Sequence, residues 1–339
     1  MVKVGKYSIG KNEPCLIIAE AGINHNGDIE KAKMLIDSAV DCGADAIKFQ
    51  THLPECEMLP QAATAKYVGE PLFDLLKRVE LSKKDHIELI DYATDKGILF
   101  LSTPFSREAV DLLEEVGVEA YKVGSGEMTN LPLLEYIVAK RKPILLSTGM
   151  STLEEIKESI IFLRAFTESL VIIHCVSSYP AAYEDLNLGF IKRLKKKFGL
   201  PVGVSDHSVG IYTALAAVAL GACVVEKHFT INRNWHGPDQ PASVTPPELA
   251  ELVKGVRAIE KALGDAKRVT PEELEIQKMA RESVVSLVDI PQGTIITQGM
   301  VWVKRPGVGI PAKYMGRVLG RKVRKTIQTN TIIEWSDLE

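Results

Sequence analysis

The chain has 339 residues, of which 46% are hydrophobic and 25% are charged, as in an ordinary globular protein. Its formal charge of −3 argues against general binding to nucleic acid or to a membrane surface, and no apolar run reaches the roughly 18 residues of a transmembrane helix. Five cysteines without CxxC spacing, and an N-terminus without an apolar leader, predict a cytoplasmic protein with reduced, mostly buried thiols.

From the N-terminus to residue 265, apolar runs of strand length alternate with amphipathic segments of helical length. The predicted strands are Cys15–Ala21, Ala46–Gln50, Ile98–Thr103, Ala120–Val123, Pro143–Ser147, Val171–Val176, Val202–Ser205 and Val224–His228. The predicted helices are Asp28–Cys42, Ser82–Lys96, Arg107–Val116, Leu131–Lys140, Thr152–Phe166, Leu188–Phe198, Tyr212–Leu220 and Pro247–Leu263.

Eight strand–helix pairs in about 250 residues are the number and length expected of a (β/α)8 TIM barrel, so residues 1–265 are predicted to form a barrel domain. The alternative is a doubly wound open sheet. That fold usually has a glycine-rich phosphate loop after its first strand, and the stretch from Glu20 to His25 is not such a loop. The barrel is the better prediction.

The C-terminal part has a different character. Residues 266–281 read as a charged helical linker, and residues 282–339 read as a small β-rich domain with eight Lys/Arg and five Asp/Glu, a balance of +3. Its predicted strands are Val284–Ile290, Val301–Lys304 and Val323–Ile327. A faint repeat of four positions predicts pseudo-twofold symmetry. At its turn position Gly is replaced by Asn, and both residues tolerate positive φ. The first copy is Ile290, Gly293, Ile295 and Ile296, and it recurs 37 positions later as Ile327, Asn330, Ile332 and Ile333.

Polar residues gather at the carboxyl ends of the predicted strands, which form the active-site face of a TIM barrel. One such residue alone is best explained as a satisfied polar group at a strand end. Lysines and carboxylates at many strand ends are costly to bury unless they are used. The residues are Glu20, Lys48, Gln50, Ser102, Thr103, Lys122, Ser125, Glu127, Ser147, Thr148, His174, Ser205, His207, Glu226 and His228.

Two histidines, His207 and His228, follow or end neighbouring strands of one predicted βαβ unit. Because side chains alternate along a strand, Ser205 shares a face with His207, and Glu226 shares one with His228. Catalytic zinc usually takes three protein ligands, so a two-histidine site favours a looser divalent ion such as Mn²⁺. The alternative is a pair of hydrogen-bonded barrel histidines. Weaker metal candidates are His25, His174 and His236, while His52 and His86 are expected to be solvent or loop residues.

An anion site is predicted at the same barrel face. Lys48 and Lys122 supply positive charge there, and the hydroxyls come from Ser125, Ser147 and Ser205. This set suits a phosphate together with a carboxylate, although each lysine could instead pair with Glu20 or Glu127 as a structural ion pair. A Lewis-acid metal beside an anion site suits carbon–carbon bond formation between a phosphorylated enol and an aldehyde.

The motifs along the chain resemble those of the sialic acid synthase family, and their order makes the resemblance specific. They are Ile18–Gly27, Lys48–Gln50, Leu101–Phe105, Lys122–Glu127, Leu146–Met150, His174–Pro180, Ser205–His207 and Glu226–Thr230. Trp302–Gly307 resembles part of that family's C-terminal antifreeze-like (SAF, β-clip) domain. The resemblance implies condensation of phosphoenolpyruvate with an open-chain N-acetylmannosamine-type aldehyde. The products would be a nine-carbon 2-keto acid and phosphate, released by C–O cleavage.

The resemblance also implies roles for individual residues. His207 and His228 would hold Mn²⁺, with Mg²⁺ or Co²⁺ as alternatives. Phosphoenolpyruvate would be bound by Lys48, Lys122, Ser125, Ser147 and Ser205. The residues implied in catalysis are Glu20, Lys48, Lys122 and Glu127, and those implied in sugar binding are Gln50, Ser177, Tyr179, Asp239 and Arg305. Arg305 would reach the N-acyl group across a homodimer in which the SAF domain of one chain caps the barrel of its partner.

Some choices stay open on the sequence alone. Ser177 stands where members of the family carry asparagine or serine, and Gly237–Asp239 matches the sialic and legionaminic acid branches better than the pseudaminic acid branch. N-acetylmannosamine and 2,4-diacetamido-2,4,6-trideoxymannose are both compatible substrates. The alternative functions are a related synthase that uses phosphoenolpyruvate and a phosphorylated aldose, and a non-catalytic carbohydrate-binding protein.

Overall fold

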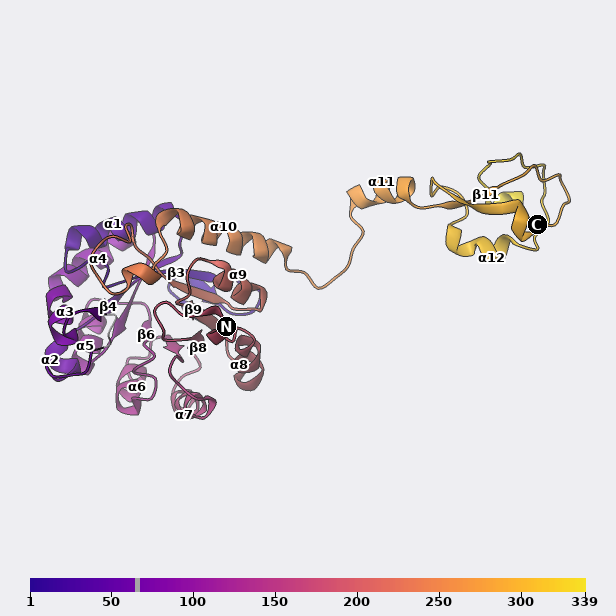
Figure 1. Cartoon of the computed structure of the whole chain (residues 1–339). Helices are drawn as coiled ribbons and strands as arrows, with labels where there is room; N and C mark the ends of the chain where they lie inside the picture. The colour runs from indigo at the N-terminus through magenta and orange to yellow at the C-terminus, as the bar shows by residue number, and fades with distance from the viewer. Residues whose placement is uncertain (65–67) are drawn as a thin grey trace. The chain divides into compact units, whose positions relative to one another are not determined.

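The computed structural model describes residues 1–64 and 68–339. The chain separates into two compact units, Met1–Gly264 and Asp265–Glu339 (Figure 1). Within the described residues, no helix is both long and apolar enough to cross a bilayer. All five cysteines are free, and three of them are buried, as the sequence predicted.

Eight parallel strands close into a barrel in the first unit, with β10 beside both β3 and β9. The predicted (β/α)8 fold is therefore confirmed, and each predicted strand boundary lies within one residue of the observed one. The barrel strands are β3 (Leu16–Gly22), β4 (Ala46–Thr51), β5 (Leu99–Pro104), β6 (Tyr121–Val123), β7 (Ile144–Ser147), β8 (Leu170–Cys175), β9 (Val202–Asp206) and β10 (Val224–His228).

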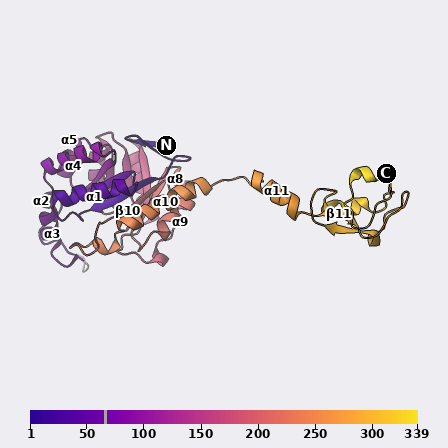
Figure 2. The same cartoon turned by 90° about the horizontal axis from the view of Figure 1, so that it is seen from above.

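The helices surround the strands, and α1 packs against both α4 and α10 (Figures 1 and 2). Several begin where a short polar side chain accepts a hydrogen bond from the first turn, as Asp28, Ser82 and Thr152 do. The helices are α1 (Ile29–Asp41), α4 (Lys83–Asp95), α5 (Arg107–Glu115), α6 (Leu131–Val138), α7 (Leu153–Arg164), α8 (Phe190–Phe198), α9 (Tyr212–Ala219) and α10 (Pro246–Ala262).

Alternation along the strands builds two apolar layers. In β3, Ile17 and Ala19 belong to the layer between sheet and helices, whereas Leu16 and Ile18 belong to the cluster inside the barrel. An N-terminal hairpin of β1 (Val2–Val4) and β2 (Tyr7–Ile9) adds its buried side chains to that inner cluster. The sequence analysis missed this hairpin, because three-residue strands are too short to show a period.

The connection between β4 and α4 carries two helices that the sequence analysis did not identify. They are α2 (Pro54–Glu57) and α3 (Leu72–Val79). Leu75, Leu76 and Val79 of α3 form a small buried cluster with Ile23, which follows β3. This connection therefore adds an apolar structure beside the carboxyl ends of the strands.

The second unit contains α11 (Pro271–Ala280), α12 (Met315–Val318) and an antiparallel pair of β11 (Ser283–Ser286) with β12 (Val301–Lys304). The predicted strand Val301–Lys304 is confirmed, and Val284–Ile290 is shorter than predicted. The predicted strand Val323–Ile327 is wrong. Val323 pairs with Leu338 and Ile327 pairs with Ile290, each as an isolated bridge. Because these residues face different partners, no continuous ladder forms.

The predicted internal repeat agrees with the structure. Ile290 and Ile327, which are equivalent in the repeat, exchange two backbone hydrogen bonds of 2.7 and 2.9 Å. Their turn residues Gly293 and Asn330 have φ of 82° and 56°. The short 3₁₀ helices Gln298–Met300 and Trp335–Asp337 follow at equivalent places. The two halves of this small domain thus meet along their own pseudo-twofold axis.

Candidate active site

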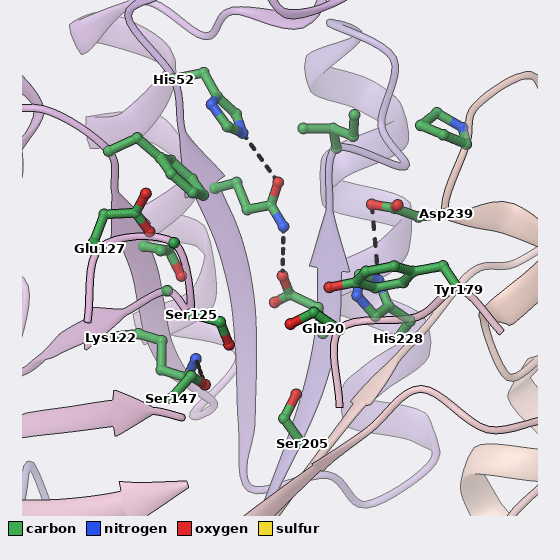
Figure 3. A pocket seen from close by; sticks show the side chains of 18 of the residues that line it. Glu20, His52, Lys122, Ser125, Glu127, Ser147, Tyr179, Ser205, His228 and Asp239 are labelled. Carbon is green, nitrogen blue, oxygen red and sulfur yellow. Dashed lines mark hydrogen bonds and ion pairs between the residues drawn. The ribbon is translucent and has the colours of Figure 1, made fainter. Parts of the chain in front are cut away.

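A cavity of about 580 Å³ lies at the carboxyl ends of the barrel strands (Figure 3). Inward-facing positions place most of its polar lining: Ile18 faces the barrel interior, so Glu20, two residues further along β3, faces it too. The polar lining comprises Glu20, Lys48, Gln50, His52, Glu57, Thr103, Lys122, Ser125, Glu127, Ser147, Ser177, Tyr179, Ser205, His207, Glu226, His228 and Asp239.

Two buried lysines share the floor of this cavity. Lys48 Nζ lies 2.7 Å from Glu20 Oε2 and 3.8 Å from Glu226 Oε2. Lys122 Nζ lies 3.6 Å from Glu226 Oε1 and donates a hydrogen bond of 2.6 Å to Ser147 Oγ. The ion pair that the sequence left as an alternative for Lys48 is therefore present. Both ammonium groups still border the cavity, where an anionic ligand can reach them.

The two carboxyl groups beside these lysines have different proton affinities. Burial and nearby Glu226 raise the pKa of Glu20 above its usual range, although Lys48 opposes this effect. Burial also acts to raise the pKa of Glu226, but Lys122 and Lys48 together hold it below its usual range. Glu226 therefore stays ionised as a partner of the lysines, while Glu20 can take up and release a proton nearer neutral pH.

Glu127 is a second carboxyl group suited to proton transfer. Its Oε2 atom is buried and has no hydrogen-bond partner among the described residues. Burial raises the pKa of Glu127 to about 7. Gly124 makes room for this side chain, because a Cβ at that position would collide with Glu127 Oε2. The geometry thus places a carboxyl group of nearly neutral pKa at the wall of the cavity.

His207 and His228 face each other across neighbouring strands, with ring centroids 5.3 Å apart. His207 Nδ1 lies 2.7 Å from the Val176 carbonyl oxygen, which can only accept, so that nitrogen carries a proton and Nε2 is the atom through which this ring could bind an ion. His228 Nδ1 is buried without a hydrogen-bond partner among the described residues. Burial, together with His207 and Lys48, lowers the pKa of His228 far below its usual value, so this imidazole is neutral.

This arrangement fits a divalent metal ion. Neutral imidazoles are the form that binds metals, and a buried nitrogen without a partner is a vacant ligand position. The carboxylate of Asp239 lies nearby, with Oδ2 3.9 Å from His228 Nδ1. Within the described residues, no group of three or more His, Cys, Asp and Glu side chains has the geometry of a metal site. An ion here would therefore complete its shell with oxygens from water and substrate.

The rim of the cavity brings further predicted residues close to the histidines. The Tyr179 ring lies against His207, with centroids 4.2 Å apart, and edge-on to His228 at 5.7 Å. Gln50 donates a hydrogen bond of 3.1 Å to Glu20. Gly149 allows the close packing beneath Ser177, because a Cβ at that glycine would collide with Ser177 Oγ. Figure 3 shows Tyr179 and Asp239 beside His228, across the cavity from Lys122 and Glu127.

Comparison with known proteins assigns the chain to a family. The model of the NeuB family matches residues 35–268, and that of the SAF domain matches residues 281–339. The N,N'-diacetyllegionaminic acid synthase of Campylobacter jejuni is 43% identical over 94% of this chain and 98% of that protein. The human N-acetylneuraminate-9-phosphate synthase is 38% identical over 96% and 93%, respectively. The chain belongs to the NeuB family.

A solved structure supports this assignment. The N-acetylneuraminic acid (sialic acid) synthetase of Leptospira borgpetersenii, in complex with citrate, superposes with a TM-score of 0.73 and 38% identity. The match covers 81% of this chain and 94% of that one. Together with the curated relatives, it makes this NeuB-family protein an enzyme of the sialic acid synthase type, with a TIM barrel and a C-terminal SAF domain.

The barrel brings together nearly every site residue predicted for this NeuB-family enzyme. Arg305 is the exception, because it belongs to the SAF unit. There it is exposed, and its Nε donates to the Ala280 carbonyl. The predicted residues that line the cavity are Glu20, Lys48, Gln50, Lys122, Ser125, Glu127, Ser147, Ser177, Tyr179, Ser205, His207, His228 and Asp239.

Some features of the NeuB-family site were missed or wrongly predicted. Glu226 received no role, although its alternation with His228 already pointed it inward. His86 is neither a solvent nor a loop residue, since it is buried in α4, whereas His52 lies in the loop after β4 as expected but is buried there. His52 bridges Gln50 and Glu57 with contacts of 3.0 and 2.8 Å and lines the cavity.

Two further differences concern the direction of side chains and the composition of the wall. His174, a weaker metal candidate, lies 2.8 Å from the Leu186 carbonyl oxygen and is absent from the described lining.

An apolar wall of the cavity was not predicted, because it depends on how the connection from β4 to α4 folds. It consists of Ile23, Met58, Val68, Leu72, Leu75, Leu76 and Phe105.

Proposed function

We propose that this enzyme condenses phosphoenolpyruvate with an open-chain N-acetylated mannose-type aldehyde, giving a nine-carbon 2-keto acid and phosphate. One observation carries the proposal: a single cavity joins two buried lysines to two facing histidines. The lysines suit the phosphate and carboxylate of the enol substrate. The histidines suit a cation that would sit beside the aldehyde.

In the proposed reaction, C3 of phosphoenolpyruvate attacks the aldehyde carbon, which forms the new C–C bond and leaves C2 cationic. Water then adds to C2 and loses a proton, while the former aldehyde oxygen gains one. The bond from C2 to the phosphoryl oxygen then breaks, the departing phosphate takes the proton of the C2 hydroxyl, and the ketone remains. Lys48, Lys122 and the serines Ser125, Ser147 and Ser205 would hold the enol substrate in line for attack. Glu20 and Glu127 would move the protons, since the pKa of each is raised by burial.

We propose Mn²⁺ as the cofactor, with Mg²⁺ or Co²⁺ as alternatives, held by His207 and His228. When bound, the ion would polarise the aldehyde as a Lewis acid. The chain's own part is to hold both rings in place and to keep His228 neutral. The contact of His207 with Val176 fixes one ring, and burial keeps His228 unprotonated.

For the sugar, we propose 2,4-diacetamido-2,4,6-trideoxymannose ahead of N-acetylmannosamine. The polar lining offers Gln50, Ser177, Tyr179 and Asp239 to hydroxyls and amides. The apolar wall offers a dry surface to methyl groups, of which the first sugar has three and the second has one. The similarity to the legionaminic acid synthase of Campylobacter jejuni supports the same choice.

The small-molecule substrates are the proposed partners, together with a second copy of the chain. In a homodimer, the SAF domain of one copy would cover the barrel mouth of the other, where Arg305 would meet the N-acyl group. The relatives match this chain across both domains, which supports a joint role for them.

The related synthases that use a phosphorylated aldose are a weaker alternative. Such a sugar brings a second phosphate, which needs its own basic residues. Among the described residues that line the cavity, Lys48 and Lys122 are the lysines and there is no arginine. Both are already needed for the enol substrate, so this arrangement favours an uncharged aldehyde.

The test is phosphate release from phosphoenolpyruvate in the presence of Mn²⁺, with each N-acetylated sugar or a phosphorylated aldose, and with or without chelator. We expect chelator-sensitive release, fastest with 2,4-diacetamido-2,4,6-trideoxymannose. Faster release with N-acetylmannosamine would overturn the sugar choice and keep the reaction. Release only with the phosphorylated aldose, or sugar binding without release, would overturn the proposed function.

A further inference from the structure

An ion pair lies directly behind the two histidines, on the outer face of the same strands. Val204 and Val225 face the layer between sheet and helices, so Asp206 and Lys227, two residues further along, face it as well. The register of β9 and β10 sets Asp206 opposite Lys227. Their side chains are 1% and 0% exposed, beside the apolar cluster between sheet and helices. Such a pair is costly to desolvate, and apolar residues could take its place.

The contacts of the pair tie several elements together. Lys227 Nζ lies 3.1 Å from Asp206 Oδ2 and donates to the Ser208 carbonyl. Asp206 Oδ1 accepts from the Ser208 amide at 2.9 Å, and Oδ2 accepts from Thr213 Oγ1 at 2.7 Å. Thr213 belongs to the first turn of α9. The pair therefore joins the ends of β9 and β10, the turn after His207 and the start of α9.

Each histidine is the next residue after one member of this pair. His207 sits between Asp206 and Ser208, which are both held by the network, and its carbonyl accepts from the Ala181 amide at 3.0 Å. His228 directly follows Lys227, and its carbonyl accepts from Val244 at 2.7 Å. Any shift of the pair would move one histidine relative to the other.

We propose that Asp206 and Lys227 are positioning residues that set the spacing between His207 and His228 for a divalent cation. The inference rests on the metal site of the proposed function. It assigns a role to the middle residues of the Ser205–His207 and Glu226–His228 motifs, for which the reaction itself has no use. A pair with a merely structural role would support folding without affecting metal affinity.

The test compares two double variants of the full chain. Asp206→Leu with Lys227→Met removes the pair and leaves no buried charge behind. Asp45→Leu with Arg257→Met removes a partly buried ion pair at the amino end of the barrel, where Arg257 also contacts Glu260. There, Asp45 Oδ2 lies 2.6 Å from Arg257 and also accepts from the Ile17 amide at 2.8 Å. Mn²⁺ binding is measured by titration calorimetry, and folding is measured by circular dichroism melts.

We expect the first variant to bind Mn²⁺ about ten- to a hundredfold more weakly than the parent chain, the usual effect of losing groups that orient metal ligands. The control should bind Mn²⁺ as the parent does, whatever its melting temperature. Equal affinity in the first variant and the parent would overturn the inference and leave the metal site standing. No Mn²⁺ binding by the parent would overturn both. If the double variant does not fold, Asp206→Asn, which keeps the shape of the side chain, is judged by the same criterion.

Discussion

At the amino end of the barrel the inward-facing side chains are apolar, whereas at the carboxyl end of the same strands many are charged or polar. In β3, buried Leu16 and Ile18 are followed by Glu20, and in β5, Leu99 and Leu101 are followed by Thr103. The β1–β2 hairpin contributes its buried residues to the first end, and the second end opens into the cavity. A step of two residues along one strand thus leads from the apolar end, which stabilises a TIM barrel, to the polar end, where the active sites of TIM barrels lie.

The sharpest test of this division is Lys122→Met, at the polar end. We expect kcat/KM for phosphoenolpyruvate to fall roughly 10²- to 10³-fold, because a preorganised charge beside the reacting anion is lost. The melting temperature should stay close to that of the parent, since Glu226 keeps Lys48 as a partner. Phosphate-release kinetics and a thermal melt measure both quantities. The variant Lys83→Met, at an exposed position, serves as the control.

Glu127→Gln tests whether burial of a carboxyl group at the polar end costs stability. The pKa of Glu127 is raised from 4.5 to about 7, so between these values the folded state binds more protons than the unfolded state. The free energy of unfolding contributed by this group therefore falls as pH rises through that window. At pH 8 the variant should be more stable than the parent by at most about 3 kcal/mol.

Near pH 4 the stability difference for Glu127→Gln should vanish, since the parent side chain is then neutral in both states. Urea unfolding at the two pH values measures it. A gain of the same size at both pH values would mean that ionisation of Glu127 is not the cause. In turnover assays the variant should be impaired, because the amide cannot transfer the proton.

The apolar end should respond in the opposite way. Ile18→Val removes one methylene from a fully buried position, two residues before Glu20. We expect a loss of about 0.5–1.5 kcal/mol in the free energy of unfolding, with kcat and KM unchanged. Urea unfolding and phosphate release measure the two effects. A changed KM would show that the two ends are mechanically coupled.

The smallest effect is expected outside both ends. Lys83 and Glu115 form an ion pair on the helical surface, with side chains 56% and 57% exposed. Because water screens such a pair, Lys83→Ala should change stability by about 0.5 kcal/mol or less. Its urea midpoint should match that of the parent, and a loss as large as that of Ile18→Val would contradict this ranking.

Much of the barrel could be predicted because its strands follow a simple rule. A strand with both faces buried reads as an apolar run, and the point where it turns polar marks its carboxyl end. The same rule located Lys48, Lys122 and His228 inside the site. The inward direction of Glu226 followed from alternation as well, although no role was drawn from it.

The missed features depend on contacts between distant segments. The β1–β2 hairpin is stabilised because Val2, Val4 and Ile9 pack against the apolar residues inside the barrel. The four residues of α2 are too few to show a period, whereas Leu72, Leu75, Leu76 and Val79 of α3 have helical spacing that was overlooked. The apolar wall exists only once these helices fold beside Ile23. The burial of His52 within its loop could not be predicted, because its partners Gln50 and Glu57 become its neighbours only through the local fold. Tertiary packing decides such cases.

The alternation that separates the two layers of the barrel also limits how this sequence can evolve. Inserting or deleting one residue within a strand would turn every later side chain to the opposite face. In β4, Lys48 would then point into the helix-facing layer and its apolar neighbours Ile47 and Phe49 would point into the barrel. Such a change would disrupt both the packing of the core and the lining of the cavity. Insertions and deletions should therefore accumulate in the connections, such as the one after β4. The strands should keep their length, because it preserves the alternation of inward and outward side chains.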